Sequence, residues 1–66
     1  MLVTVNDKEI EIFSGARVKN VLLKYSQEEY EAVQTGEKKV VDKNGNPLDL
    51  DGELSESSKL YIRNNT

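Results

Sequence analysis

The chain has 66 residues, which allow one domain with one modest core, and its lack of cysteine excludes a disulfide, a thiolate metal site and a thiol nucleophile. Twelve acidic residues against nine basic ones give a net charge of −3, so we expect no nucleic-acid partner, because such binding depends on attraction to phosphates. The longest apolar runs, such as Val21-Leu22-Leu23, are far too short to span a bilayer, so we expect a cytoplasmic protein with no membrane association.

The first predicted element is a β-hairpin. Residues 2–5 and residues 9–13 each alternate apolar and polar side chains, which is the pattern of half-buried strands. Between them lie the turn formers Asn6-Asp7-Lys8. The residues expected to face the core are Val3, Val5, Ile10 and Ile12.

Helical spacing replaces the alternation after Ser14-Gly15. Val18, Val21, Leu22 and Tyr25 recur at offsets of three, four and seven, which predicts a main helix with one apolar stripe. We expect this helix to cover the hairpin.

A second, short helix is predicted over residues 27–34. Ser26, followed three residues later by Glu29, is the pattern of a capping box at its start. Tyr30 and Val33 form its expected inward pair, and Gly36 can end it in a left-handed cap.

The rest of the chain predicts short strands joined by turns. Residues 39–42 form one strand, and residues 48–50 return after a turn centred on Asn44-Gly45. Pro47 confines that return to a sheet edge or a turn. After a further turn at Asp51-Gly52, residues 59–63 alternate again. In this last strand Leu60 and Ile62 are expected inward and Tyr61 outward.

This order of elements predicts the α+β class and, within it, a ubiquitin-like β-grasp. In that fold a mixed sheet, here of four or five strands, wraps one main helix, and the short second helix is an addition. We expect residues 1–66 to form a single β-grasp domain, either alone or as the N-terminal module of a longer protein.

Several segments resemble the small sulfur-carrier proteins of thiamine and molybdopterin biosynthesis. They are Val3-Thr4-Val5-Asn6-Asp7-Lys8-Glu9-Ile10, Gly15-Ala16-Arg17-Val18, Val21-Leu22-Leu23, Leu54 and Leu60-Tyr61-Ile62. In those proteins a partner enzyme adenylates the C-terminal Gly-Gly and converts it to a thiocarboxylate. Here the corresponding positions are Asn64, Asn65 and Thr66. The resemblance therefore implies a fold but carries no functional residue over to this chain.

The acidic stretch at residues 42–53 partly matches a calcium loop. Counted from Asp42, oxygen ligands at the required positions are Asn44, Asn46 and Glu53. The sixth position, where such a loop needs glycine for a sharp turn, is Pro47.

Two interpretations of this stretch follow. The favoured one is a polar hairpin with solvated turns. The alternative is a weak calcium-binding module in which Asp49, Asp51 and Glu53 hold a divalent ion.

The residue types argue against an enzyme. Catalysis needs a reactive group with a tuned pKa in a cavity, and a core of this size encloses little. No histidine is present to activate Ser14, Ser55, Ser57 or Ser58. The glycines are dispersed, so no phosphate-binding loop is formed. We therefore predict no catalytic, cofactor-binding or metal-binding residue and no cofactor.

A binding role remains as the expected function. A β-grasp sheet offers an exposed strand edge and an outer face, where Thr4, Phe13 and Tyr61 can contribute, whereas Tyr25 and Tyr30 are expected in the core. We predict a non-catalytic protein-interaction or accessory domain whose partner is another protein or another domain of the same chain. The alternative is a sulfur carrier whose Gly-Gly lies beyond the present C-terminus.

Overall fold

The computed structural model describes residues 1–65. Its elements, in chain order, are β1 (Leu2–Val5), β2 (Lys8–Glu11), α1 (Val18–Tyr25), α2 (Gln27–Gln34), β3 (Lys38–Val41), β4 (Pro47–Leu48) and β5 (Lys59–Asn64). They form an α+β domain with a mixed five-stranded open sheet and two helices. The expectation about Thr66 lies outside the described residues.

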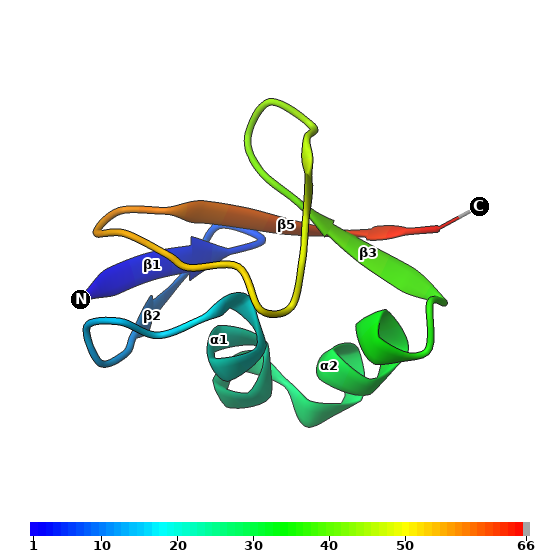
Figure 1. Cartoon of the computed structure of the whole chain (residues 1–66), viewed down its shortest axis with the longest axis horizontal. Coiled ribbons are helices and arrows are strands. Elements are labelled where there is room, and N and C mark those ends of the chain that lie inside the picture. The colour runs from blue at the N-terminus through cyan, green and yellow to red at the C-terminus, as the bar shows by residue number, and fades with distance from the viewer. Residues whose placement is uncertain (66) are drawn as a thin grey trace.

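The sheet has the strand order β2-β1-β5-β3-β4. β1 and β5 are parallel neighbours, and the pairs β1–β2, β3–β5 and β3–β4 are antiparallel. Both helices lie on one side of the sheet, and the β3–β4 hairpin projects on the other side (Figure 1). One face of the sheet is thus covered by helices, and the opposite face carries none.

The N-terminal hairpin forms as predicted for β1, but β2 is shorter than expected. Asn6 and Asp7 both have positive φ angles, 51° and 69°, which gives a two-residue turn and brings Lys8 opposite Val5. The second strand therefore begins at Lys8 and ends at Glu11 instead of spanning residues 9–13. Beyond it, Phe13 lies in the loop before α1 and is 60% exposed.

The core lies between the sheet and α1. The alternation and the helical stripe placed twelve residues inward. Except for Tyr25, Tyr30 and Val33, these residues are buried. They are Val3, Val5, Ile10, Ile12, Val18, Val21, Leu22, Leu60 and Ile62. Ala16 and Val40 complete the cluster. Tyr25, Tyr30 and Val33 pack against it while remaining partly exposed.

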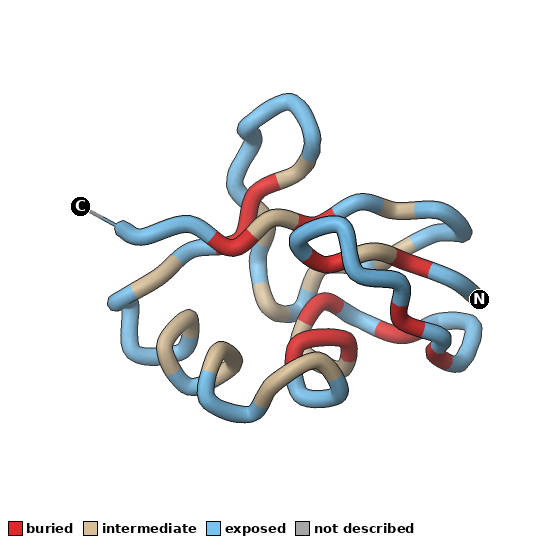
Figure 2. Tube along the Cα trace, turned by 180° about the vertical axis from the view of Figure 1, so that it is seen from behind, coloured by how far each residue is buried: buried red, intermediate tan, exposed pale blue. Residues whose placement is uncertain are grey.

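The two helices differ in burial, and the second helix spans the residues predicted for it, 27–34. Each helix has eight residues. Three residues of α1 are buried, but none of α2 is, as the absence of red along α2 shows (Figure 2). The reason is that α2 packs beside α1 and β3, at the margin of the core. No helix within residues 1–65 is long and apolar enough to cross a membrane.

The capping box of α2 is half formed. The Ser26 Oγ accepts the N–H of Glu29 at 3.3 Å, as predicted. The Glu29 carboxylate, however, accepts from the Lys38 ammonium of β3. After the helix, Gly36 has a φ of 88°, which confirms the predicted left-handed residue.

The strands of the C-terminal half lie within one or two residues of their predicted positions. β3 begins one residue earlier and excludes Asp42, whose carboxylate accepts the N–H groups of Asn44 and Asn46 and so closes the turn. β4 is confined to Pro47–Leu48 instead of residues 48–50. It lies at the sheet edge, which confirms the position expected for Pro47.

Candidate functional site

The uncovered face of the sheet carries a compact set of side chains from β3 and β5. In the antiparallel register Lys39 lies opposite Arg63, and Val41 lies opposite Tyr61. Lys59 precedes Tyr61 by two residues and therefore lies on the same face. We call this set of five residues (Lys39, Val41, Lys59, Tyr61 and Arg63) the Tyr61 face.

The centre of the Tyr61 face is apolar and its margins are basic. Val41 is 7% exposed because it lies between Tyr61 of β5 and Pro47 of β4. Tyr61 is half-buried, and the Arg63 guanidinium lies over its ring, 5.3 Å from the centroid. This contact holds the guanidinium beside the aromatic ring while Arg63 remains exposed.

Five of the other six basic residues of the chain contact another residue of the fold. Arg17 and Lys19 pair with Glu53 and Asp51, and Lys38 pairs with Glu29. Lys24 donates to the carbonyl of Glu11, and Lys8 lies over the ring of Tyr25. Within residues 1–65, four basic residues on strands form no ion pair or hydrogen bond through their side chains. They are Lys8 and the three basic residues of the Tyr61 face, Lys39, Lys59 and Arg63.

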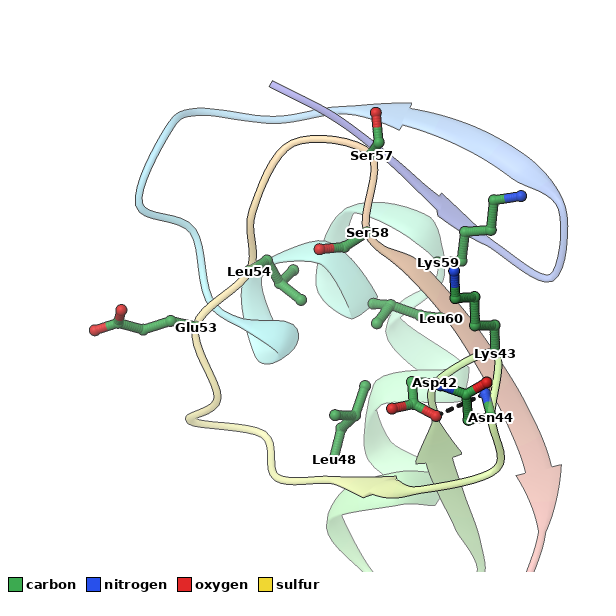
Figure 3. Close-up of a pocket in the computed structure, with 10 residues that line it drawn as sticks. All are labelled: Asp42, Lys43, Asn44, Leu48, Glu53, Leu54, Ser57, Ser58, Lys59 and Leu60. Carbon is green, nitrogen blue, oxygen red and sulfur yellow. Dashed lines mark hydrogen bonds between the residues drawn. The ribbon is translucent and has the colours of Figure 1, made fainter.

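A notch adjoins the Lys59 end of this face. Its volume is about 280 Å³, and the leucines Leu48, Leu54 and Leu60 contribute its apolar surface (Figure 3). Lys43 and Lys59 line it as well. The notch arises because β3 leaves the sheet at Asp42, so the register between β3 and β5 does not continue past Tyr61. Its volume lies just below the range of small-molecule sites, about 300 to 1,000 Å³.

Two of the three carboxylates considered as calcium ligands have basic partners within the fold. Asp51 accepts from the Lys19 ammonium at 2.9 Å, which is the chief cause that lowers the pKa of Asp51. Glu53 lies 3.9 Å from the Arg17 guanidinium. Within residues 1–65, no three acidic side chains come together as metal ligands. Two of these three residues, Asp51 and Glu53, therefore connect their loop to the start of α1.

Asp42, the first residue of that stretch, organises the hairpin. Its carboxylate accepts the backbone N–H of Asn46 at 2.9 Å and that of Asn44 at 2.8 Å. The Asn46 hydrogen bond is the main cause that lowers the pKa of Asp42, with Asn44 adding to it and partial desolvation opposing it. The structure thus assigns the Asp42 carboxylate a turn-forming role, as in the favoured interpretation of a polar hairpin.

The serines of the loop between β4 and β5 also form a turn. The Ser58 hydroxyl donates to the carbonyl of Ser55 and accepts the Ser55 N–H. Ser57 has a φ of 68°, a conformation typical of tight turns. No catalytic base contacts these hydroxyl groups within residues 1–65.

Of the outward residues expected at a binding surface, only Thr4 and Tyr61 lie on the sheet. Thr4 is half-buried and pairs with Lys59 across β1 and β5. Phe13 lies outside the strands. The basic residues of the Tyr61 face were not singled out by the sequence analysis. The alternation of Lys59, Tyr61 and Arg63 already placed them on one side of a strand, but their proximity to Lys39 depends on which strands pair.

Comparison of the chain with family models, with curated proteins and with solved structures found no match. The fold and the surface described above are therefore the grounds on which a function is argued.

Proposed function

We propose that the chain is a non-catalytic protein-interaction domain of the ubiquitin-like β-grasp fold and that it binds its partner through the Tyr61 face. The fold assignment is supported by a central parallel β1–β5 pair, an N-terminal hairpin and an α1 helix packed on one side of the sheet. A β-grasp, in which a sheet wraps one main helix, requires these features. The partner is another protein or another domain of the same chain.

The observation that carries this proposal is the composition of the Tyr61 face. An aromatic side chain at the centre of a surface, beside an aliphatic residue and a stacked arginine, has the residue types that dominate binding energy in protein interfaces. The helices lie on the other side of the sheet, so a partner can reach this face. Within residues 1–65, no acidic side chain forms an ion pair with Lys39, Lys59 or Arg63.

The carrier alternative places a Gly-Gly tail beyond residue 66, whereas the described chain is held in place as far as Asn65. A sulfur carrier needs a free tail after its last strand. Here the Asn65 backbone N–H donates to the carbonyl of Glu37, and its side-chain amide donates to the carbonyl of Gly36. These two bonds hold Asn65 against the turn between α2 and β3.

Site-specific photo-crosslinking tests the proposed function. A benzophenone amino acid replaces Lys39 on the Tyr61 face in one protein and Gln34, exposed on α2, in a control protein. Both are irradiated in extract of the source cells, with and without excess unlabelled protein. We expect a discrete product from position 39 that the unlabelled protein competes away and that position 34 does not give. The same products from both positions, or no product from position 39, would contradict the proposal.

A further inference from the structure

The basic side chains of the Tyr61 face are arranged in rows. Lys39 and Arg63 form one row, and Val41 and Tyr61 form the next, two residues further along each strand. Two residues along a strand span about 7 Å. On the far side of the apolar row, Lys59 lies two residues from Tyr61 on β5, and Lys43, in the turn after β3, lines the notch together with Lys59.

Lys43 lies beside the Lys59 end of the Tyr61 face. Both line the notch, and Figure 3 shows them on one side of it. The resulting pattern along β5 is basic, apolar, basic, and Lys39 and Val41 of β3 lie beside its first two rows. It spans about 14 Å from the first row to the last, at the strand rise of about 3.4 Å per residue.

An extended peptide presents side chains at positions i, i+2 and i+4 on one side, with the same spacing of about 7 Å. We propose that the Tyr61 face binds an extended acidic segment of a partner protein, in which an apolar residue is flanked at i−2 and i+2 by aspartate or glutamate. The apolar residue lies against Tyr61 and Val41, and the carboxylates meet the two basic rows. This inference rests on the proposed function, because it names the partner chemistry of the same surface.

The charges inside the fold support this partner. Arg17, Lys19 and Lys38 are neutralised by acidic residues of the chain itself, whereas Lys39 and Lys59 form no ion pair within residues 1–65. Basic side chains that a fold leaves without acidic partners on one surface are available to carboxylates of another molecule. Arg63 is held in place by Tyr61, so less side-chain freedom is lost when it binds.

A nucleic acid fits the same surface less well. The chain has a net charge of −3, and Glu9 of β2 lies opposite Thr4 on the same sheet face, with β1 between Glu9 and Lys59 of β5. Acidic residues beside the basic rows repel a continuous phosphate backbone. A segment with two separated carboxylates and an apolar centre brings fewer negative charges to this face and uses the apolar row.

Peptide titration followed by amide chemical shifts tests the inference. The probe is the acetylated and amidated peptide Ser-Glu-Thr-Leu-Thr-Glu-Ser, and the control peptides carry lysine for both glutamates or serine for the leucine. We expect shifts concentrated at residues 39–43 and 59–63, binding that weakens as salt is raised, and at least tenfold weaker binding of both control peptides. Equal binding of the acidic and basic peptides would overturn the inference, as would tighter binding of single-stranded oligouridine.

Matched protein variants complete the test. Arg63→Glu should lower the affinity for the acidic peptide at least tenfold, whereas Lys8→Glu, the same charge change on β2, should leave it within twofold. Both variants must retain the dispersed amide spectrum of the folded protein. Equal effects of the two variants would overturn the inference. If position 39 still crosslinks a competed partner while the acidic peptide fails to bind, the partner chemistry is wrong and the proposed function stands.

Discussion

The Lys38 ammonium lies 2.8 Å from Oε1 of Glu29 and joins β3 to α2. Both side chains are partly covered, with 30% and 26% of their surfaces exposed. Because α2 has no buried residue, this ion pair contributes to holding the helix against the sheet. The hydrogen bond that the Lys38 ammonium donates to Glu29 is the main cause that raises the pKa of Lys38 above its usual 10.5, and desolvation partly opposes it.

The first prediction concerns alkaline stability. Because the pKa of Lys38 is raised in the folded state, its contribution is fully present below 10.5 and is lost as the pH rises through the folded-state value. We expect the melting temperature of Lys38→Met to fall less steeply than that of the wild type between about pH 9 and 12, which brackets the usual lysine pKa. Lys39→Met, which removes a lysine without an ion pair in residues 1–65, should follow the wild type. Parallel curves for all three proteins would contradict the prediction.

Adjacent leucines of α1 provide a test of the core. Leu22 is 0% exposed and Leu23 is 46% exposed. Leu22→Ala should lower the free energy of unfolding by about 3 kcal/mol, because it removes buried surface and leaves a cavity. Leu23→Ala should change it by less than about 0.5 kcal/mol. Urea denaturation measures both, and similar losses for the two variants would show that α1 does not pack as described.

Gly36 tests the turn between α2 and β3. Its φ is +88°, and a Cβ placed there would meet nothing within 4 Å. The cost of Gly36→Ala therefore comes from the backbone conformation, about 1 kcal/mol of unfolding free energy, without a steric clash. Gly36→Asn should cost less, because asparagine tolerates the left-handed region better. Thermal or urea unfolding of the two variants compares them, and an alanine variant as stable as the wild type would refute the explanation.

The hydrogen bonds of Asp42 predict that the hairpin between β3 and β4 is sensitive to acid. Hydrogen bonds, first from the Asn46 N–H, lower the pKa of Asp42 below 3.8. The contribution of its carboxylate to stability is therefore present above 3.8 and is lost as the pH falls through the folded-state value. The amide resonances of Asn44 and Asn46 should shift with a common midpoint below 3.8. Asp42→Asn should abolish this shift, and Asp7→Asn, in the other hairpin turn, should leave it unchanged. A shift that survives Asp42→Asn would have another origin.

Much of the fold could be predicted because the relevant signals are local. Alternation placed Val3 and Val5 inward correctly, since the side-chain period of a strand depends only on its own backbone. Ser26 and Gly36 marked the ends of α2 for the same reason. One error, at the end of β3, occurred where a side chain competes for backbone groups. Asp42 was expected in a strand, but its carboxylate binds the amides of the following turn.

The candidate site was predictable only in part. The alternation correctly directed Tyr61 outward, but the sequence contains no sign that Lys39 lies opposite Arg63. These residues are far apart in the chain, and their proximity requires β5 to insert between β1 and β3. The same holds for the acidic stretch, where spacing alone suggested calcium ligands although Asp51 pairs with Lys19 of α1.

The sequence by itself determined most of the buried residues and the ends of α2, because these depend on neighbouring residues and on the backbone geometry of single elements. Tyr25, Tyr30 and Val33, which were expected inward, stay partly exposed. The tertiary structure alone decided the order of the strands and the partner of each charge. It neutralised Arg17, Lys19 and Lys38 with acids from distant segments and left Lys39, Lys59 and Arg63 together on one face. The physical reason is that sheet register brings distant segments into contact, and register is set by the packing of the whole core.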